Sequence, residues 1–368
     1  MIRNDCLGII FSNTNDELLP QLTKKRTIAS IPFGGRYRLI DFALSNLVNA
    51  GISKVGIITK SNYNSLLDHL GSGIAWDLDR KIGGLFILPP FGSAKAGFFG
   101  NKLDALESNM TFLKRSYEEY VVLSDSDIVS NIDIDGLIKA HKKSDADVTV
   151  AYKTGEIPKG RETKAITLTK DGNVTDMSSS ADDGAYSLDI YVMRRELLIN
   201  LVELSGRYGA EALTRTVISK ELGDLTIKGY EVTEFAEIIY SKERYAEVSM
   251  SLLERENRQK LFSPERPVYT KTRDDMPTRY GVSSVIENSL IAGGCVIEGA
   301  ARNCVIFRGV EIGEGAEISN SIIMQGTKIG KNCRLEYVII DKAAEISDGI
   351  TLIGKKDNYI YIGKEQKM

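Results

Sequence analysis

A six-residue period in the C-terminal part of the chain constrains its fold more than any other feature. Hexads such as Gly-Val-Glu-Ile-Gly-Glu (309–314) and Gly-Thr-Lys-Ile-Gly-Lys (326–331) follow one another there. Apolar side chains recur at this interval in three series: Ile306, Ile312, Ile318 and Met324; Ile340, Ile346 and Leu352; and Leu290 with Val296. Such repeats are typical of a parallel β-helix, in which one apolar side chain per hexad fills a narrow prism. The alternative, an antiparallel sheet, would alternate at period two.

The chain before the repeats alternates apolar runs with helical patterns. Strands are predicted over Cys6–Phe11, Val55–Lys60, Tyr120–Ser124, Val148–Lys153, Ala165–Thr169 and Ser187–Met193. Helices are predicted over Arg38–Ala50, Glu196–Leu204 and Ala212–Leu222. Gly51 is positioned to end the first of these helices. This order predicts an α/β domain with a largely parallel sheet, covered by helices on both faces, which binds ligands beyond the carboxyl ends of its strands.

A linker separates the two regions. Glu247–Lys260 has a helical pattern, and the three prolines between Phe262 and Tyr280 predict an extended segment after it. A chain of 368 residues is long enough to form two cores. We therefore expect a first domain at 1–257, a linker at 258–280 and a β-helix domain at 281–368.

Composition argues against several kinds of partner and location. The net charge of −3 gives no reason to expect nucleic acid or a membrane surface as a partner. No apolar stretch approaches the roughly 20 residues that span a bilayer, and no signal-peptide pattern is present, so we expect a cytoplasmic protein. The cysteines are expected to be reduced core thiols, and His69 and His141 to pack within helices. The cysteines are Cys6, Cys295, Cys304 and Cys333.

The loop after the first predicted strand lacks the residues that bind phosphate. In a nucleotide-binding sheet, this loop is rich in glycine and carries a cation, so that backbone N–H groups and a positive charge meet the phosphate. Here residues 12–18 contain no glycine, and the acidic pair Asp16-Glu17 lies where a phosphate would be. The scaffold is that of a nucleotide enzyme, but the means of holding the phosphate has been removed.

Two distant segments resemble bacterial ADP-glucose pyrophosphorylases. One is Phe33-Gly-Gly-Arg-Tyr-Arg-Leu-Ile-Asp-Phe-Ala-Leu-Ser-Asn46, followed by Asn49-Ala-Gly-Ile52, and the other runs from Pro267-Val-Tyr269 to Ile291-Ala-Gly-Gly-Cys-Val-Ile297. Together they extend the resemblance over nearly the whole chain. The resemblance implies a Rossmann-like nucleotidyltransferase domain followed by a left-handed β-helix of hexapeptide repeats.

The resembled family joins glucose 1-phosphate to ATP with a glycine loop, an arginine, lysines and a magnesium ion held by two aspartates. This chain departs from the family at each of these positions. The loop arginine and the catalytic lysine are replaced by Glu17 and Ile28, and the metal aspartates by Ser126 and Ile238. The sugar-phosphate lysine corresponds to Ser180. We expect no catalytic residue and no required cofactor in this chain, with Mg²⁺ needed by a catalytic partner.

Three further sets of candidate residues follow from the resemblance. A one-residue slip of the loop would let Asp125 or Asp127 supply a metal-binding carboxylate. Gly100, Asp104 and Arg36 are the candidates for a residual nucleotide pocket. The basic run Lys24-Lys25-Arg26 is either a solvated face or, as the family implies, a site for an anionic sugar-phosphate effector. Arg38 and Asp41, at a predicted helix start, are expected to be a structural pair.

The combined departures are most similar to the non-catalytic D-type subunits of the family. This implies a regulatory subunit in glycogen biosynthesis that assembles with the catalytic ADP-glucose pyrophosphorylase subunit, as a heterotetramer. Two alternatives stay open. One is a weakly active glucose-1-phosphate adenylyltransferase that uses Asp125 or Asp127, and the other is a free-standing sensor of sugar phosphate or nucleotide.

Overall fold

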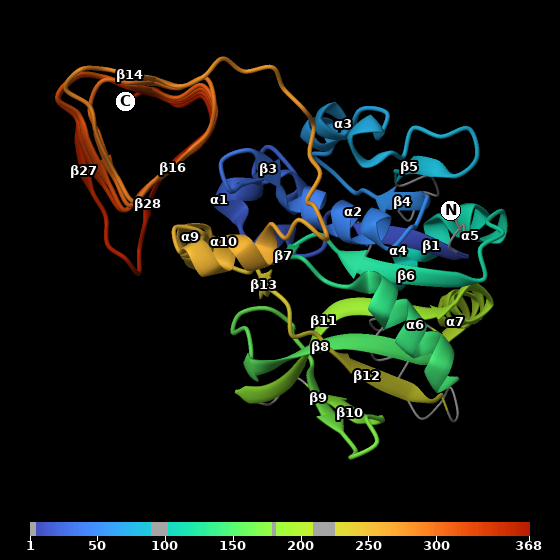
Figure 1. The fold of residues 1–368 in the computed structure, drawn as a ribbon. Coiled ribbons are helices and arrows are strands. Elements are labelled where there is room, and N and C mark those ends of the chain that lie inside the picture. Colours follow the sequence, from blue (N-terminus) through green and yellow to red (C-terminus); the bar gives the residue numbers. More distant parts are fainter. Residues whose placement is uncertain (1–4, 90–101, 179–181, 209–224) are drawn as a thin grey trace.

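The structure is a computed structural model that describes residues 5–89, 102–178, 182–208 and 225–368. Figure 1 shows an α/β domain and, beside it, a triangular prism of short strands that contains the C-terminus. The predicted helix Ala212–Leu222 and the site positions Gly100 and Ser180 lie outside the described residues.

The central strand of the α/β domain is β1 (Cys6–Phe11). Its neighbours β4 (Lys54–Ile58) and β6 (Tyr120–Asp125) both run parallel to it, and β5 (Gly84–Leu88) extends the parallel part beyond β4. Every residue of β1 is buried. A strand buried on both faces needs a continuous apolar run, which is why this segment could be predicted from the sequence.

Helices cover the two faces of this sheet. On one face lie α2 (Leu39–Asn49) and α6 (Ile134–Ser144), and on the other lie α4 (Lys102–Ser108), α5 (Met110–Lys114) and α7 (Arg195–Tyr208). Alternate residues of β1 belong to the two cores that these helices form with the sheet. The site beyond the carboxyl ends of the strands is therefore held by a rigid, double-sided core.

The sheet continues past β6 with antiparallel strands. The long strand β11 (Asp183–Arg194) pairs antiparallel with both β6 and β8 (Val148–Glu156), and β12 (Ile227–Glu231) runs parallel to β8. β9 (Ala165–Leu168) and β10 (Val174–Ser178) complete the sheet. Of the strands in this sheet, β5, β10 and β12 were not predicted from the sequence.

The α/β domain also contains shorter elements outside the main sheet. They are α1 (Pro20–Thr23), β2 (Pro32–Phe33), β3 (Tyr37–Arg38), α3 (Asn64–Leu70), β7 (Ile128–Ser130), β13 (Ala236–Ile238), α9 (Lys242–Ser251) and α10 (Arg255–Leu261). The single helix predicted over Glu247–Lys260 is thus two helices. Residues 263–278 carry no helix or strand and lead to the prism.

The prism is a parallel β-helix made of three five-stranded sheets, one for each side. One sheet contains β14 (Arg279–Tyr280), β17 (Val296–Ile297), β20 (Glu311–Ile312), β23 (Lys328–Ile329) and β26 (Glu345–Ile346). The second contains β15 (Val285–Glu287), β18 (Ala300–Arg302), β21 (Glu317–Ser319), β24 (Arg334–Glu336) and β27 (Thr351–Ile353). The third contains β16 (Leu290–Ile291), β19 (Val305–Ile306), β22 (Ile322–Ile323), β25 (Val338–Ile340) and β28 (Ile360–Ile362). The predicted fold class is confirmed, and the prism is consistent with a left-handed β-helix.

Successive coils repeat after seventeen residues in the middle of the β-helix. Ile306 pairs with Ile323, which pairs with Ile340, and all three side chains are buried inside the prism. Three full hexads would need eighteen residues, so each coil is one residue short. The prediction that Met324 continues the interior series is therefore wrong: Met324 is buried outside the prism, in a core shared with the α/β domain.

The outer face of the third sheet packs on the α/β domain. Val305, Ile322 and Ile339 project from β19, β22 and β25 into one core with Phe33 and Phe42 of the α/β domain. This shared core contains fully buried side chains from both domains. The two domains are therefore joined by packing as well as by the linker.

The cysteines and histidines have the structural roles that the sequence predicts. All four cysteines are free and buried. His69 lies in α3, where its Nε2 is 2.6 Å from Asp41 Oδ1, and His141 lies in α6, where its Nδ1 is 2.8 Å from Thr149 Oγ1. In the described part of the chain, no helix has the length and apolar character needed to cross a membrane.

Candidate functional site

In the loop after β1, side chains of the loop form hydrogen bonds with one another and with nearby backbone N–H groups. A nucleotide enzyme would hold phosphate at this place. Asn13 accepts the Lys60 N–H at 2.7 Å and donates to Asp16 Oδ2 at 2.6 Å. The other oxygen of Asp16 accepts the Ile28 N–H at 2.7 Å. A backbone donor near this loop is thus used by a carboxylate of the same chain. Burial raises the pKa of Asp16 to about 6.

Three of the described residues that align with the family's catalytic positions are buried and offer no free side chain for phosphate or metal chemistry. Ile28 is fully buried in the core between the domains, and Ile238 is buried in β13. Ser126 is also buried, and its hydroxyl donates to the Phe11 carbonyl at 3.0 Å. Glu17 is exposed, in the short helical turn after the loop.

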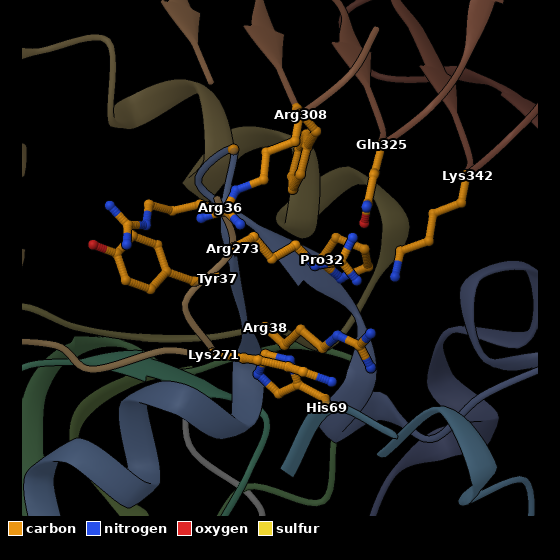
Figure 2. A pocket seen from close by; sticks show the side chains of 12 residues that line it. Pro32, Arg36, Tyr37, Arg38, His69, Lys271, Arg273, Arg308, Gln325 and Lys342 are labelled. Atoms are coloured by element: carbon orange, nitrogen blue, oxygen red, sulfur yellow. The ribbon is translucent and has the colours of Figure 1, made fainter. Parts of the chain in front are cut away.

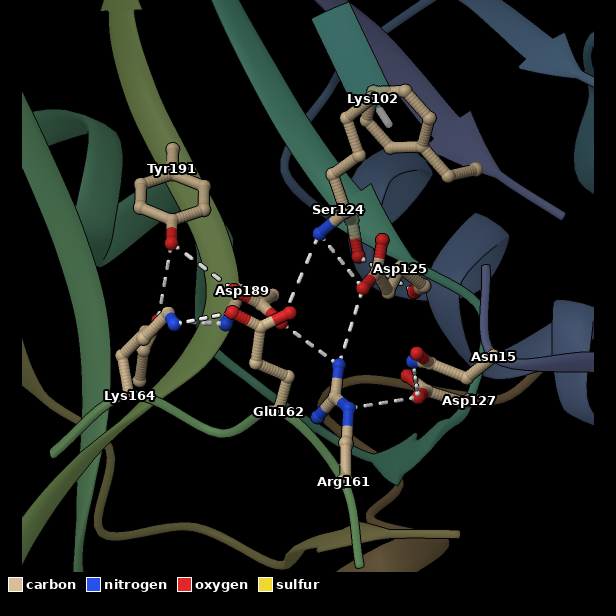
Figure 3. A network of polar contacts seen from close by, with 12 residues as sticks. Asn15, Lys102, Ser124, Asp125, Asp127, Arg161, Glu162, Lys164, Asp189 and Tyr191 are labelled. Atoms are coloured by element: carbon tan, nitrogen blue, oxygen red, sulfur yellow. Dashed lines mark hydrogen bonds and ion pairs between the residues drawn. The ribbon is translucent and has the colours of Figure 1, made fainter. Parts of the chain in front are cut away.

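Beyond the end of β6, three carboxylates and two cations form one buried cluster (Figure 3). Arg161 Nη2 lies 3.1 Å from Asp125 Oδ2 and 2.9 Å from Asp189 Oδ2, and its Nε lies 3.3 Å from Asp127 Oδ2. Lys102 Nζ lies 2.8 Å from Asp125 Oδ2 and 3.7 Å from Asp189 Oδ2. We call these five residues the ion cluster.

The ion cluster changes the proton affinities of its members. Although burial opposes it, the neighbouring carboxylates raise the pKa of Lys102 and Arg161. Burial raises the pKa of Asp125 to about 7, because three carboxylates share two cations in a low-dielectric site. Asp189 keeps a lowered pKa, because Lys102 and Arg161 outweigh its burial.

The two aspartates proposed as metal ligands are therefore already paired. Asp125 contacts both cations of the ion cluster, and Asp127 contacts Arg161 and accepts the Asn15 side-chain N–H at 2.8 Å. Among the described residues, no group of three or more His, Cys, Asp or Glu side chains is arranged to hold a metal ion. The residues present at the end of β6 do not fit the magnesium ion that the family resemblance implies.

Two of the three candidates for a residual nucleotide pocket lie on different elements. Asp104 lies on α4, which covers one face of the sheet, whereas Arg36 lines a hollow between the two domains. Gly100 lies outside the described residues, so the pocket stays a prediction.

This hollow, which we call the basic hollow, is lined by six cationic side chains (Figure 2). They are Arg36 and Arg38 of the α/β domain, Lys271 and Arg273 of the linker, and Arg308 and Lys342 of the β-helix. The enclosed space among them is small, about 30 Å³, and the rest of the hollow is open to solvent. Figure 2 shows Arg308, Gln325 and Lys342 extending from the β-helix toward Arg38 and His69 on the other side.

Carboxylates pair with two of these cations. Arg308 pairs with Asp275 at 3.2 Å and Lys271 with Asp68 at 3.8 Å, whereas no ion pair of Lys342 is found among the described residues. Burial, with the nearby guanidinium groups of Arg38 and Arg26, lowers the pKa of Lys342 to about 7. Burial also lowers the pKa of Arg38, to about 10. Unpaired cations in a half-enclosed hollow attract an anion with several negative charges.

The basic run predicted from the sequence lies beside the hollow but does not line it. Arg26 is buried, and its Nη2 donates to both carboxylate oxygens of Asp341 at 2.7 Å. Lys25 forms an exposed pair with Glu365 at 3.2 Å, and Lys24 is exposed. The sequence analysis did not identify Arg308 and Lys342 as residues of this hollow. Their spacing could have indicated that they lie together, because Arg308, Gln325 and Lys342 follow one another at the seventeen-residue coil spacing.

Comparison with known proteins identifies the family of each domain. Residues 8–177 match the family model described as nucleotidyl transferase, and residues 275–359 match the model described as GlmU-like, C-terminal hexapeptide. Fold and matches together define a nucleotidyltransferase-type domain followed by a hexapeptide β-helix. Over 365 residues, the chain is 38% identical to the glycogen biosynthesis protein GlgD of Bacillus subtilis (strain 168), covering 99% of this chain and 97% of that protein.

Other relatives carry the same name or that of the related enzyme. GlgD of Geobacillus stearothermophilus is 38% identical, over 86% of this chain and 84% of that protein. A glucose-1-phosphate adenylyltransferase of Bacillus cytotoxicus is 29% identical, over 96% of each chain. The chain belongs to the GlgD family.

Proposed function

We propose that this chain acts in glycogen biosynthesis as a non-catalytic, regulatory subunit. In this proposal it assembles with a catalytic ADP-glucose pyrophosphorylase chain, as a heterotetramer in the cytoplasm, and raises the activity of that chain. The partner makes ADP-glucose and pyrophosphate from ATP and glucose 1-phosphate with Mg²⁺. The relatives named for glycogen biosynthesis and for glucose-1-phosphate adenylyltransferase support the pathway and the partner's reaction.

One observation carries the non-catalytic part of the proposal. At the end of β6, where the family resemblance implies a metal site, Asp125 and Asp127 are already in ion pairs with Lys102 and Arg161. Removing a single preorganised electrostatic contact typically lowers a rate by about 10²–10³. Several contacts are absent here, since Ile28 and Ile238 are buried apolar residues. Such losses are not strictly additive, but together they exceed what an active enzyme tolerates.

Co-expression with a catalytic chain tests the proposal. We expect the two chains to co-purify and to form ADP-glucose faster together than the catalytic chain does alone, whereas this chain alone forms none. Substantial ADP-glucose formation by this chain alone, lost on Asp127→Asn, would favour the weakly active enzyme. Failure of the two chains to co-purify would favour the free-standing sensor.

We further propose that the effector site of this subunit is the basic hollow and that its ligand is an anionic sugar phosphate. The six cations come from both domains and the linker, so a bound anion would tie these parts together. Charge-assisted hydrogen bonds from arginine are the usual way in which proteins hold phosphate groups. This assignment moves the expected effector site from Lys24-Lys25-Arg26 to the residues that line the hollow.

A paired set of variants tests this site. Arg308→Gln with Lys342→Gln is expected to weaken binding of a sugar bisphosphate by at least about tenfold, because each charged hydrogen bond is worth about 1.5–3 kcal/mol. The matched control is Lys328→Gln with Arg334→Gln, which removes the same charges from exposed positions of β23 and β24. An equal loss of sugar bisphosphate affinity in both double variants would contradict a binding site in the basic hollow. A loss with Lys25→Ala and Arg26→Ala alone would return it to the basic run.

A further inference from the structure

The ion cluster has the composition of a divalent-cation site whose centre is occupied by a side chain. Asp125, Asp127 and Arg161 are each 1% exposed or less, and Asp189 is 15% exposed. The guanidinium of Arg161 contacts all three carboxylates, within 2.9–3.3 Å. Figure 3 shows it between Asp125, Asp127 and Asp189, with Lys102 reaching in from the other side.

Charge explains why the cluster needs a cation at this point. Burying three carboxylates together is very costly unless opposite charges are in contact with them. Two oxygens, Asp125 Oδ1 and Asp127 Oδ1, remain buried without a hydrogen-bond partner in the described structure. Carboxylate oxygens of this kind are the ligands that Mg²⁺, Ca²⁺ and Mn²⁺ prefer. Without Arg161, three carboxylates and Lys102 would carry a formal charge of −2, which one divalent cation neutralises.

Asp125 and Asp127 lie on either side of the point where β6 ends. β6 ends at Asp125, and Ser126 and Asp127 form the bend that follows it. The Ser126 hydroxyl donates to the Phe11 carbonyl, whereas Asp125 and Asp127 both contact Arg161. The carboxylates next to the family's metal position therefore meet a cation from the β8–β9 connection.

We infer that Arg161, with Lys102 beside it, is a built-in replacement for a divalent cation. The chain needs no metal at the end of β6, and removing Arg161 uncovers a divalent-cation site formed by Asp125, Asp127 and Asp189. Arg161 is then a positioning residue that holds β6 and β11 to the β8–β9 connection. This inference concerns the isolated chain and goes beyond the proposed regulatory function, since it holds whether or not a catalytic partner is activated.

Mn²⁺ binding to the purified full-length chain, measured by electron paramagnetic resonance, tests the inference. The wild-type chain is expected to show no saturable Mn²⁺ site. The Arg161→Ala chain is expected to bind one Mn²⁺ ion and to unfold at a higher temperature in Mg²⁺ than in EDTA. The double variant Arg161→Ala with Asp127→Asn is expected to have lost this Mn²⁺ site. Arg161→Lys and Lys102→Met are the matched controls: each keeps a cation among the carboxylates, so neither is expected to gain a site.

Several results would overturn the inference. One is a Mn²⁺ site in the wild-type chain that Asp127→Asn abolishes, and another is a folded Arg161→Ala chain without such a site. If Lys102→Met also gained a Mn²⁺ site, Arg161 would not be the group that replaces the divalent cation. Arg161→Gln replaces the alanine variant if that variant does not fold. If neither variant folds even with Mn²⁺ present, the inference also fails, because a cation in the place of Arg161 should restore the cluster.

Discussion

The ion cluster and the basic hollow differ in how their charged side chains are paired. In the ion cluster, three carboxylates are matched by two cations within the same chain, at buried positions between strands. In the basic hollow, six cations from two domains and the linker surround a space with few carboxylates. The first site pairs its charged groups within the chain, and the second keeps positive charge that an outside anion could pair with.

This contrast supports the proposal that a ligand binds at the basic hollow and not at the ion cluster. A site whose charges are paired internally gains little from a ligand, because the ligand must first displace the existing partners. A site with crowded like charges gains from any anion that relieves their repulsion. The architecture of a nucleotidyltransferase thus persists as a scaffold, while its open charge lies at the junction of the domains.

The largest effect is expected from placing two catalytic residues of the resembled family back into this chain. Glu17→Arg with Ile28→Lys puts two family residues back, but Ile28 is fully buried in the core between the domains. An unpaired ammonium there should lower the free energy of unfolding by more than about 4 kcal/mol. Urea unfolding measures this loss, and an assay for ADP-glucose is expected to show no product.

The control for this restoration is Glu17→Arg alone, which changes an exposed residue and should alter stability by no more than about 0.5 kcal/mol. A stable double variant that forms ADP-glucose would contradict the contrast between the ion cluster and the basic hollow. The nucleotide-binding end of the sheet would then be only two substitutions away from activity.

The sequence predicts this fold well wherever a local pattern decides it. The apolar run of β1 and the amphipathic pattern of α2 are local signals, and each appears within about a residue of its predicted bounds. The hexads predicted the β-helix in the same way. The position of Met324 could not be predicted, because it depends on one residue missing from each coil and on the packing of a second domain.

The sites were less predictable because their residues meet only in three dimensions. Asp125 and Asp127 were identified as carboxylates, but their partner Arg161 lies on another connection, and nothing local to it signals the contact. The hollow likewise combines residues from 32 to 342. Charge pairing between distant segments follows from topology, which the local patterns determine only in outline.

A second large effect is expected at the buried pair that borders the hollow. Arg26 and Asp341 are 3% and 2% exposed, and Tyr361 also donates to Asp341 at 2.7 Å. Arg26→Met leaves the carboxylate of Asp341 buried without its cation, which should cost about 3 kcal/mol of unfolding free energy. Arg26→Met with Asp341→Leu should recover part of that cost, as urea unfolding of both variants would show.

The exposed pair Lys25–Glu365 provides the comparison, and Lys25→Ala should cost less than about 1 kcal/mol. If Arg26→Met lowered the unfolding free energy as little as Lys25→Ala, the ion pair of Arg26 would contribute little to stability. Arg26 would then resemble the unpaired cations of the hollow.

A smaller effect of opposite sign is expected within the hollow. Lys342→Gln removes a cation that lies near Arg26, Arg38 and Arg273, so it should raise the free energy of unfolding by about 1 kcal/mol when no anion is bound. The same variant should bind a sugar bisphosphate more weakly. Thermal unfolding with and without the anion measures both changes, with Lys328→Gln as the control. A loss of stability without anion would show that Lys342 is already satisfied.

A further effect concerns pH and the loop after β1. Burial raises the pKa of Asp16 from 3.8 to about 6 in the folded chain. The folded state therefore holds a proton more tightly than the unfolded state, so the contribution of Asp16 to stability is full below pH 3.8 and is lost as pH rises to about 6. Relative to Asp16→Asn, the wild-type chain should lose stability between pH 4 and pH 6 and show a constant difference above that.

Urea unfolding of both chains from pH 4 to pH 8 measures this difference, and the exposed neighbour Glu17→Gln should follow the wild-type profile. The opposite slope, with stability rising from pH 4 to pH 6, would mean that the Ile28 N–H and Asn13 stabilise the Asp16 carboxylate more than burial opposes it. The loop would then still be an anion-binding loop that holds a carboxylate of its own. In that case both regions of the molecule would favour anions, and they would differ only in whether the chain supplies the anion itself.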